Sequence, residues 1–162
     1  MLDNKRMIFI HGLEGTSQGV KASLLHGLFP EMLIPDFRGT LEVRIASLEE
    51  YLVDKNNWTI VGSSFGGLMG AIFTCQRPEQ VKKLVLLAPA LVWPDFAKMP
   101  PQPVNVPVIA YHGSRDKIVP LEPVCSLAEK IFSNLDFRIV DDDHGLYKTV
   151  HQINWRLILD GS

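Results

Sequence analysis

The sequence has few cysteines, little net charge and no long hydrophobic run. Its two cysteines, Cys75 and Cys125, lie in segments with helical patterns and lack metal-ligand spacing, which predicts reduced thiols and a cytoplasmic location. The formal net charge of −2 offers no basic surface for nucleic acid. The longest uncharged apolar run, residues 84–93, has about half the length of a membrane-spanning helix, so no membrane span is expected.

The composition also argues against a signal peptide and against disorder. The first apolar segment, residues 7–10, ends at His11-Gly12 and is too short for the apolar region of a signal peptide. Hydrophobic residues make up 46% of the 162 residues and charged residues 21%, the opposite of a disordered chain. A chain of this size buries about 70% of the surface that its unfolded state exposes. We therefore expect residues 1–162 to form a single domain.

Six short apolar runs are spread along the chain, each rich in Ile, Leu or Val on consecutive positions. Such runs are typical of strands buried on both faces of a parallel sheet. Longer segments with helical spacing separate them, so right-handed crossovers should cover both faces of the sheet with helices. The predicted fold class is α/β, a three-layer αβα sandwich with a six-stranded, mostly parallel sheet. The strands are expected at 7–10, 32–34, 59–61, 84–87, 106–111 and 137–140.

Five segments carry the helical spacing. One apolar stripe follows Thr40, a candidate N-cap, and another lies close to the C-terminal end. The helices are expected over 19–28, over 65–76, and around the stripes Leu41-Ile45-Leu48-Leu52, Val124-Leu127-Ala128-Ile131 and Leu146-Val150-Ile153-Leu157.

The segment Gly62-Ser63-Ser64-Phe65-Gly66 reads G-x-S-x-G, directly after a predicted strand and before a Gly-rich helix. A serine on a sharp strand-to-helix turn exposes its hydroxyl, and its neighbours must be small to permit the strained backbone. We therefore predict that Ser64 is a nucleophile and that Ser63 is a small spacer. A tight turn that needs small residues only for packing is the alternative.

A serine hydroxyl needs a base, and the base needs a carboxylate that orients it. His144 follows the last predicted strand and Asp116 follows the fifth, so both should lie at the same edge of the sheet as Ser64. Asp95, after the fourth strand, is the rival for the carboxylate. The acidic run 141–143 is expected to solvate the end of a strand, and the absence of a second ligand cluster argues against a metal site.

Acyl transfer also needs N–H donors for the oxyanion of the tetrahedral intermediate. The N–H of Phe65, directly after the nucleophile, is one candidate. The other is the N–H of Leu13, in the Gly-rich loop that follows the first strand. An ordinary strand-to-helix turn is the alternative for this loop. His11 and His112 each precede a glycine at the end of a strand and are expected to hydrogen-bond within their turns.

Taken together, these motifs resemble the α/β-hydrolase superfamily over nearly the whole chain. They are the His11-Gly12 loop, the G-x-S-x-G turn, the acid turn 113–116 and the base turn 143–145, in the family's order. The segment 34–39 also resembles the family's Pro-Asp-x-Arg-Gly segment, and the loop patterns are similar to those of small, lid-less YqiA-like esterases. The resemblance implies a single minimal α/β-hydrolase domain with strand order 2-1-3-4-5-6. It would have two strands fewer than the full family sheet.

The family's cap usually lies in the interval that residues 89–106 occupy here, which is too short for a helical cap and forms at most a flap carrying Trp93, Phe96 and Met99. We therefore expect a shallow site for short-chain or activated esters. Its candidate apolar walls are Leu13, Phe65, Trp93, Ile118 and Leu146.

The resemblance implies a serine hydrolase that cleaves a small carboxylic ester or thioester through an acyl-serine intermediate, with no metal or organic cofactor. In it, Ser64 attacks, His144 transfers the proton, and Asp116 orients His144. A non-catalytic hydrolase scaffold that binds a small molecule or a protein is the alternative. A homodimer that covers the apolar rim at Trp93 and Phe96 is also left open.

Overall fold

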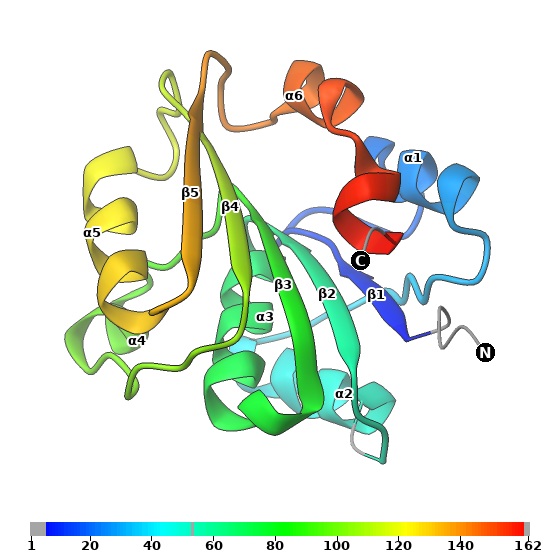
Figure 1. Cartoon of the computed structure of the whole chain (residues 1–162), viewed down its shortest axis with the longest axis horizontal. Coiled ribbons are helices and arrows are strands. Elements are labelled where there is room, and N and C mark those ends of the chain that lie inside the picture. The colour runs from blue at the N-terminus through cyan, green and yellow to red at the C-terminus, as the bar shows by residue number, and fades with distance from the viewer. Residues whose placement is uncertain (1–5, 53, 161–162) are drawn as a thin grey trace.

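The strands form one parallel sheet at the centre of the molecule (Figure 1). A computed structural model describes residues 6–52 and 54–160. In this part of the chain, five strands pair in the order β1-β2-β3-β4-β5, and every neighbouring pair is parallel. The strands are β1 (Met7–Ile10), β2 (Trp58–Ser63), β3 (Val81–Leu87), β4 (Val108–Gly113) and β5 (Leu135–Val140).

The strand predicted at 32–34 is reduced to a single bridge. Leu33 pairs in parallel with Ile8: its N–H donates to the Met7 carbonyl, and its carbonyl accepts from the Phe9 N–H, both at 2.9 Å. The next donor in a parallel ladder would be residue 35, but Pro35 has no N–H. The predicted six-stranded sheet is therefore corrected to five strands, with the bridge beside β1 where the extra strand was expected.

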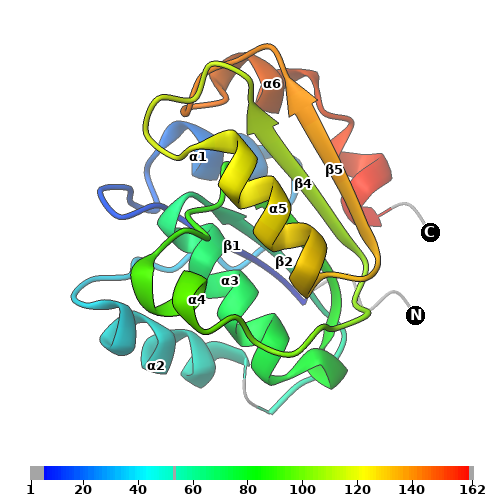
Figure 2. The same cartoon turned by 90° about the vertical axis from the view of Figure 1, so that its left-hand side faces the viewer.

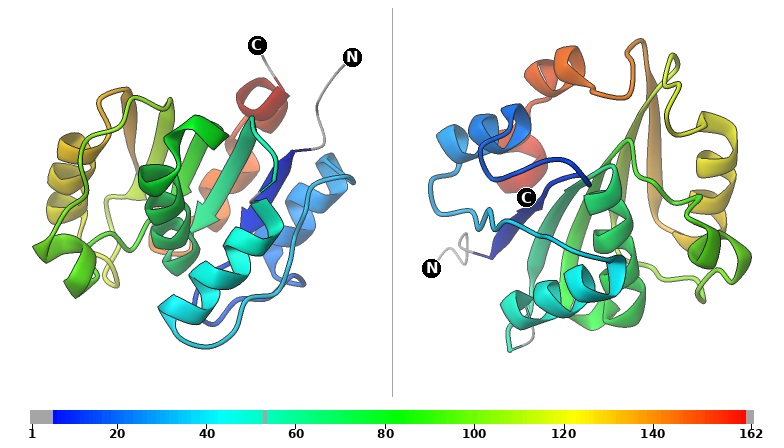
Figure 3. Two further views of the ribbon diagram at one scale, coloured as in Figure 1. Left: turned by 90° about the horizontal axis from the view of Figure 1, so that it is seen from below. Right: turned by 180° about the vertical axis from the view of Figure 1, so that it is seen from behind.

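Helices cover both faces of the sheet, which confirms the three-layer αβα architecture (Figures 1 and 2). α1, α6 and η2 lie on one face, whereas α2, α3, α4 and α5 lie on the other, as the rear view in Figure 3 also shows. The helices are α1 (Val20–Leu28), α2 (Leu41–Leu52), α3 (Phe65–Gln76), the 3₁₀ turn η1 (Pro78–Gln80), α4 (Pro94–Lys98), α5 (Leu121–Ile131), α6 (Tyr147–Gln152) and the π-helical turn η2 (Arg156–Asp160).

Each face of the sheet has its own apolar core. On one face, side chains such as Leu48, Phe73 and Ile131 pack α2, α3 and α5 against the strands. On the other face, Leu25 and Trp155 belong to the core that holds α1 and the C-terminal segment. Burial of apolar side chains on both faces explains why the strands carry consecutive rather than alternating apolar residues.

The C-terminal stripe does not form one continuous helix. α6 ends at Gln152, because Ile153 is extended, and Leu157, predicted on the apolar face, is exposed. The break lets Trp155 turn into the core, where its indole N–H donates to the Val150 carbonyl at 2.8 Å. Burying an indole outweighs the few helical hydrogen bonds that the break loses.

Because the strands are parallel, their carboxyl ends meet at one edge of the sheet. The segments that follow β1, β2, β4 and β5 carry the predicted site residues to this edge. Among the helices of the described residues, none has the length and apolar character that crossing a membrane requires.

Candidate active site

Ser64 occupies the sharp turn between β2 and α3. Its backbone has φ 55° and ψ −113°, a conformation that L residues rarely adopt. The turn is closely packed: a Cβ on Gly62 would collide with the Gly66 carbonyl, and a Cβ on Gly66 would collide with the Ile10 carbonyl. The two glycines of the G-x-S-x-G motif are therefore required by close backbone approach.

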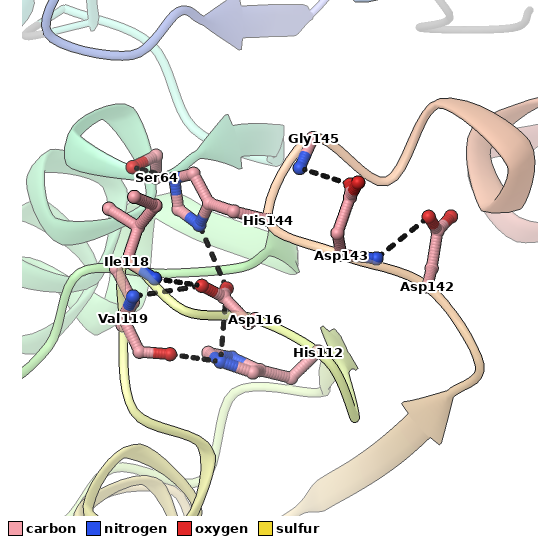
Figure 4. Close-up of polar contacts among 9 residues, drawn as sticks. All are labelled: Ser64, His112, Asp116, Ile118, Val119, Asp142, Asp143, His144 and Gly145. Atoms are coloured by element: carbon pink, nitrogen blue, oxygen red, sulfur yellow. Dashed lines mark hydrogen bonds and ion pairs between the residues drawn. The ribbon is translucent and has the colours of Figure 1, made fainter.

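Ser64, His144 and Asp116 lie in hydrogen-bonded series (Figure 4). Ser64 Oγ lies 3.0 Å from His144 Nε2, and His144 Nδ1 lies 2.8 Å from Asp116 Oδ2. Since a carboxylate accepts only, Nδ1 carries the proton and Nε2 is free to accept the serine proton. The structure thus brings together three side chains from turns that follow β2, β4 and β5.

Asp116 is held in its ionised form. Its side chain is fully buried, and Oδ1 accepts the N–H groups of Ile118 and Val119 at 2.9 and 2.8 Å. Burial by itself would raise the pKa of Asp116, but the hydrogen bonds from Val119, His144 and Ile118 together lower it below its usual value. The carboxylate is therefore charged at neutral pH and fixes the orientation of His144. The rival carboxylate, Asp95, is an exposed residue of α4.

A second histidine lies against the same carboxylate. His112 is fully buried, and its Nε2 lies 2.9 Å from the Val119 carbonyl and 3.3 Å from Asp116 Oδ2 (Figure 4). Both neighbours are acceptors, so Nε2 carries the proton. His112, a residue of β4, thereby ties the ends of the loop 112–119 together and supports the Asp116 side chain.

The acidic run before His144 was expected to solvate the end of β5, and Asp141 and Asp143 are exposed, but Asp142 is structural. Asp142 is buried; its Oδ2 accepts the Thr149 N–H and hydroxyl at 2.9 and 2.8 Å, and its Oδ1 accepts the Asp143 N–H at 2.8 Å. Burial would raise the pKa of Asp142, but these bonds lower it below the usual value. The Asp143 side chain accepts the Gly145 N–H at 3.0 Å. The run therefore shapes the turn that carries His144 and anchors it to α6.

The two predicted oxyanion donors lie beside Ser64. Leu13, Phe65 and Ser64 line one cleft. Within the described part of the chain, neither the Leu13 N–H nor the Phe65 N–H donates a hydrogen bond. The Phe65 N–H is free because the first N–H groups of a helix have no partner within it. Both donors are thus available to a negatively charged oxygen.

The loop that carries Leu13 is fastened at both ends. Asp36 accepts the N–H and hydroxyl of Ser17 at 2.6 and 3.0 Å, and these bonds are the main reason that the pKa of Asp36 lies below its usual value. His11 donates from Nδ1 to the Gly12 carbonyl at 2.6 Å, and its Nε2 accepts the Phe37 N–H at 2.8 Å. The Pro-Asp-x-Arg-Gly segment therefore braces this loop.

The cleft beside Ser64 has a volume of about 770 Å³. Four of the five predicted walls line it: Leu13, Phe65, Trp93 and Ile118, with the rings of Phe65 and Trp93 edge to face at 5.1 Å. Leu146, the fifth, does not. It is fully buried in the core beneath α6 and adopts a left-handed backbone conformation, φ 51°. The turn at Leu146 directs its side chain inward, and the neighbouring residues Gly145 and Tyr147 line the cleft instead.

A second cavity of about 690 Å³ lies on the other side of His144. It is lined by the acid turn and the base turn, and it shares Ile118, His144, Gly145 and Tyr147 with the first cleft. His144 therefore lies between the two cavities and borders both.

The interval between β3 and β4 holds only the short helix α4. Phe96 is buried in the core and Met99 is exposed, so of the three side chains assigned to a flap only Trp93 reaches the cleft. Charged groups at the cleft are Glu14 and Lys21, whose ammonium lies 4.8 Å from the Tyr147 ring centre. Burial lowers the pKa of Lys21, and the nearby Asp142 and Asp143 oppose that shift.

Comparison with known proteins relates this chain to hydrolases of the same fold. The family model described as alpha/beta hydrolase fold matches residues 42–105. The chain is similar to Lipase LipV of Mycobacterium tuberculosis, with 29% identity over 172 residues that cover 95% of this chain and 62% of the lipase. The chain thus spans less than two thirds of that relative's length.

Two solved structures share the fold. Alpha/beta hydrolase domain-containing protein 10 from mouse superposes with a TM-score of 0.76 and 20% identity, covering 90% of this chain and 85% of that chain. A predicted CIB-like hydrolase from Thermoplasma acidophilum gives a TM-score of 0.75 and 24% identity, covering 99% and 87%. The match over residues 42–105, the similarity to the lipase and these superpositions show that this chain has the α/β-hydrolase fold.

Proposed function

We propose that this chain is a serine hydrolase that cleaves a small carboxylic ester or thioester through an acyl-serine intermediate. The observation that carries the proposal is the series Ser64–His144–Asp116, with bonds of 3.0 and 2.8 Å, at the junction of two cavities. The similarity to a lipase supports the choice of an ester over other hydrolase substrates.

The first half of the reaction forms the acyl-serine. Ser64 Oγ attacks the carbonyl carbon while its proton passes to His144 Nε2. The carbonyl oxygen becomes an oxyanion that accepts the N–H groups of Leu13 and Phe65. Collapse of this intermediate breaks the bond to the alcohol or thiol, which takes the proton from His144 and leaves.

The second half regenerates the enzyme. Water gives a proton to His144 Nε2 and attacks the acyl-serine carbonyl. The second tetrahedral intermediate then breaks its bond to Ser64 Oγ, which takes the proton back from His144, and releases the carboxylic acid. Asp116 stays ionised throughout and stabilises the imidazolium form of His144. The two cavities beside His144 offer separate places for the acyl group and the leaving group.

The apolar character of one cavity indicates where the acyl group binds. The cleft of about 770 Å³ is bordered by Leu13, Phe65 and Trp93, none of which lines the second cavity, whereas the second cavity is bordered by charged residues of the acid turn. We therefore assign the acyl chain to the first and the leaving group to the second. Rates with a series of p-nitrophenyl esters and matching thioesters of increasing chain length would define the preferred acyl group.

A fluorophosphonate probe tests the nucleophile. Wild type should be labelled, Ser64→Ala should not, and the neighbouring Ser63→Ala should label as wild type does, because Ser63 is a buried spacer. A correctly folded wild type that resists the probe and hydrolyses no ester would favour the non-catalytic scaffold. Labelling of Ser64→Ala would assign the nucleophile to another residue.

A further inference from the structure

Arg44 is a buried cation next to the candidate active site. It lies on α2, and only 5% of its surface is exposed. Arginine is rarely buried to this degree unless a carboxylate or another anion compensates its charge. Its burial therefore calls for an explanation other than the packing of an ordinary surface helix.

The guanidinium bridges three parts of the molecule. Nε donates to the Gly39 carbonyl at 3.0 Å, and Nη2 donates to the Leu13 carbonyl at 3.1 Å. The guanidinium carbon lies 5.4 Å from the centre of the Phe65 ring, within the range of a cation–π contact. Arg44 thus contacts both residues whose N–H groups are the candidate oxyanion donors.

The charge of Arg44 has no anionic partner among residues 6–52 and 54–160. No ion pair involves it there, and its Nη1 is buried without a hydrogen bond. Two carbonyl dipoles and one aromatic face compensate a buried charge only in part, and burial lowers the pKa of Arg44 from its usual value. An arginine nevertheless remains charged at neutral pH.

We propose that Arg44 is a positioning residue for the oxyanion hole: it fixes the Leu13 loop against the Phe65 turn, and its uncompensated charge favours the tetrahedral anion. This inference rests on the proposed hydrolase function. Asp36 and His11 fasten the ends of this loop, whereas the Leu13 peptide in its middle, between Gly12 and Gly15, needs a restraint of its own. The bond from Arg44 to the Leu13 carbonyl is such a restraint.

Arg44 acts on the transition state and not on the ground state, since the anion exists only while the tetrahedral intermediate forms. Loss of Arg44 should therefore lower kcat and leave KM nearly unchanged. Removing one oxyanion donor outright costs enzymes about 10²- to 10³-fold in kcat, so misplacing two donors without deleting them should cost about 10- to 100-fold.

The test compares Arg44→Met, Arg44→Lys and Arg44→Ala with wild type, using p-nitrophenyl acetate. Arg156→Met is the matched control: this guanidinium also lies over a phenylalanine ring, 5.9 Å from the centre of Phe29, but it borders a cavity that shares no residue with the cleft. Active sites are counted by saturating fluorophosphonate labelling, and folding is checked by circular dichroism. Rates per labelled site then exclude losses that come only from misfolded protein.

The expected result is a fall in kcat per labelled site for Arg44→Met, at constant KM, with a smaller fall for Arg44→Lys. Arg44→Ala should regain activity in low, non-denaturing guanidinium chloride but not in sodium chloride of equal concentration, whereas Arg156→Met should keep wild-type kcat. Wild-type kcat per site in folded Arg44→Met, or a loss confined to KM, overturns the inference. If Arg44→Met does not fold, Arg44→Lys decides in the same way, because a wild-type kcat there overturns the inference as well.

The outcomes separate this inference from the function on which it rests. An inactive, unlabelled wild type refutes the hydrolase itself. An active, labelled wild type together with fully active Arg44 variants refutes only the role of Arg44.

Discussion

Replacing Asp116 by asparagine tests the link between the buried carboxylate and His144. Asparagine keeps an oxygen that can accept the Ile118 and Val119 N–H groups, so the loop need not rearrange. Its NH₂ group, however, takes the place of Oδ2 and faces two N–H donors, His144 Nδ1 at 2.8 Å and His112 Nε2 at 3.3 Å. The simplest way to remove this clash between donors is a change of His144 to the other tautomer.

The two consequences of this change differ in size. In the other tautomer, His144 Nε2 carries a proton and cannot accept the one from Ser64. This defect costs about 10⁴-fold in kcat, or about 5.5 kcal/mol of transition-state stabilisation. Folding loses one charge-assisted hydrogen bond, worth about 1.5–3 kcal/mol. Asp116→Asn should therefore be nearly inactive but folded.

The assay compares kcat for a short-chain ester with the free energy of unfolding in urea. Asp95→Asn, which changes the exposed rival carboxylate on α4, is the control and should change neither quantity by much. Asp116→Asn with activity within tenfold of wild type would refute the orienting role of Asp116. An equal loss of activity in Asp95→Asn would assign that role to the rival.

The same variant carries a prediction about pH. The pKa of Asp116 is lower in the folded protein than in the unfolded chain, so its stabilising contribution is complete at neutral pH and disappears as pH falls below about 4. The stability difference between wild type and Asp116→Asn should therefore shrink on acidification. A difference that stayed constant down to low pH would contradict the depressed pKa.

Two further pairs of substitutions test the structure around the site. Gly66→Ala should lower the free energy of unfolding by more than about 3 kcal/mol or prevent folding, because its Cβ meets the Ile10 carbonyl. Gly27→Ala, with open space around it on α1, should instead stabilise the protein by about 0.5–1 kcal/mol. Urea unfolding measures both changes, and a small loss of stability in Gly66→Ala would contradict the packing argument. Asp142→Ala should lower the free energy of unfolding by about 2 kcal/mol and slow catalysis, because it loosens the turn before His144. Asp141→Ala, which removes an exposed carboxylate paired with Arg115, should do neither. Equal effects of the two substitutions would show that Asp142 does not anchor this turn.

The regular elements were predictable where burial alone determines them. β1 and α3 begin and end at the predicted residues, and the stripe from Leu41 to Leu52 matches α2. The predicted strand around Leu33 is reduced to one bridge, because Pro35 has no N–H for the next hydrogen bond of the ladder and three apolar residues do not make up for that loss. The prediction of one helical stripe at the C-terminal end was wrong, because burying Trp155 in the core stabilises the fold more than an unbroken helix would.

The site residues were predictable to the extent that they follow strands. Ser64, Asp116 and His144 each come just after a predicted strand, and parallel pairing alone brings such positions to one edge. Asp142 and Arg44 were missed because their partners are set by how loops pack. A signal for Arg44 did exist: it lies three residues after Leu41 and four before Leu48, so the helical period places a charged residue on the buried face. Leu146 was misassigned because its left-handed backbone turns the side chain inward.

The short interval between β3 and β4 has a consequence for the fate of an acyl-enzyme. With only α4 in the place of a cap, Leu13 and Ile118 at the rim of the cleft are 51% and 73% exposed. A serine-bound acyl group would therefore remain in contact with bulk solvent, and any dissolved nucleophile would compete for it by concentration. Because water is the solvent, it would react with most of the acyl groups. Added methanol would divert some of them to the methyl ester, and this fraction should rise with the share of methanol in the solvent.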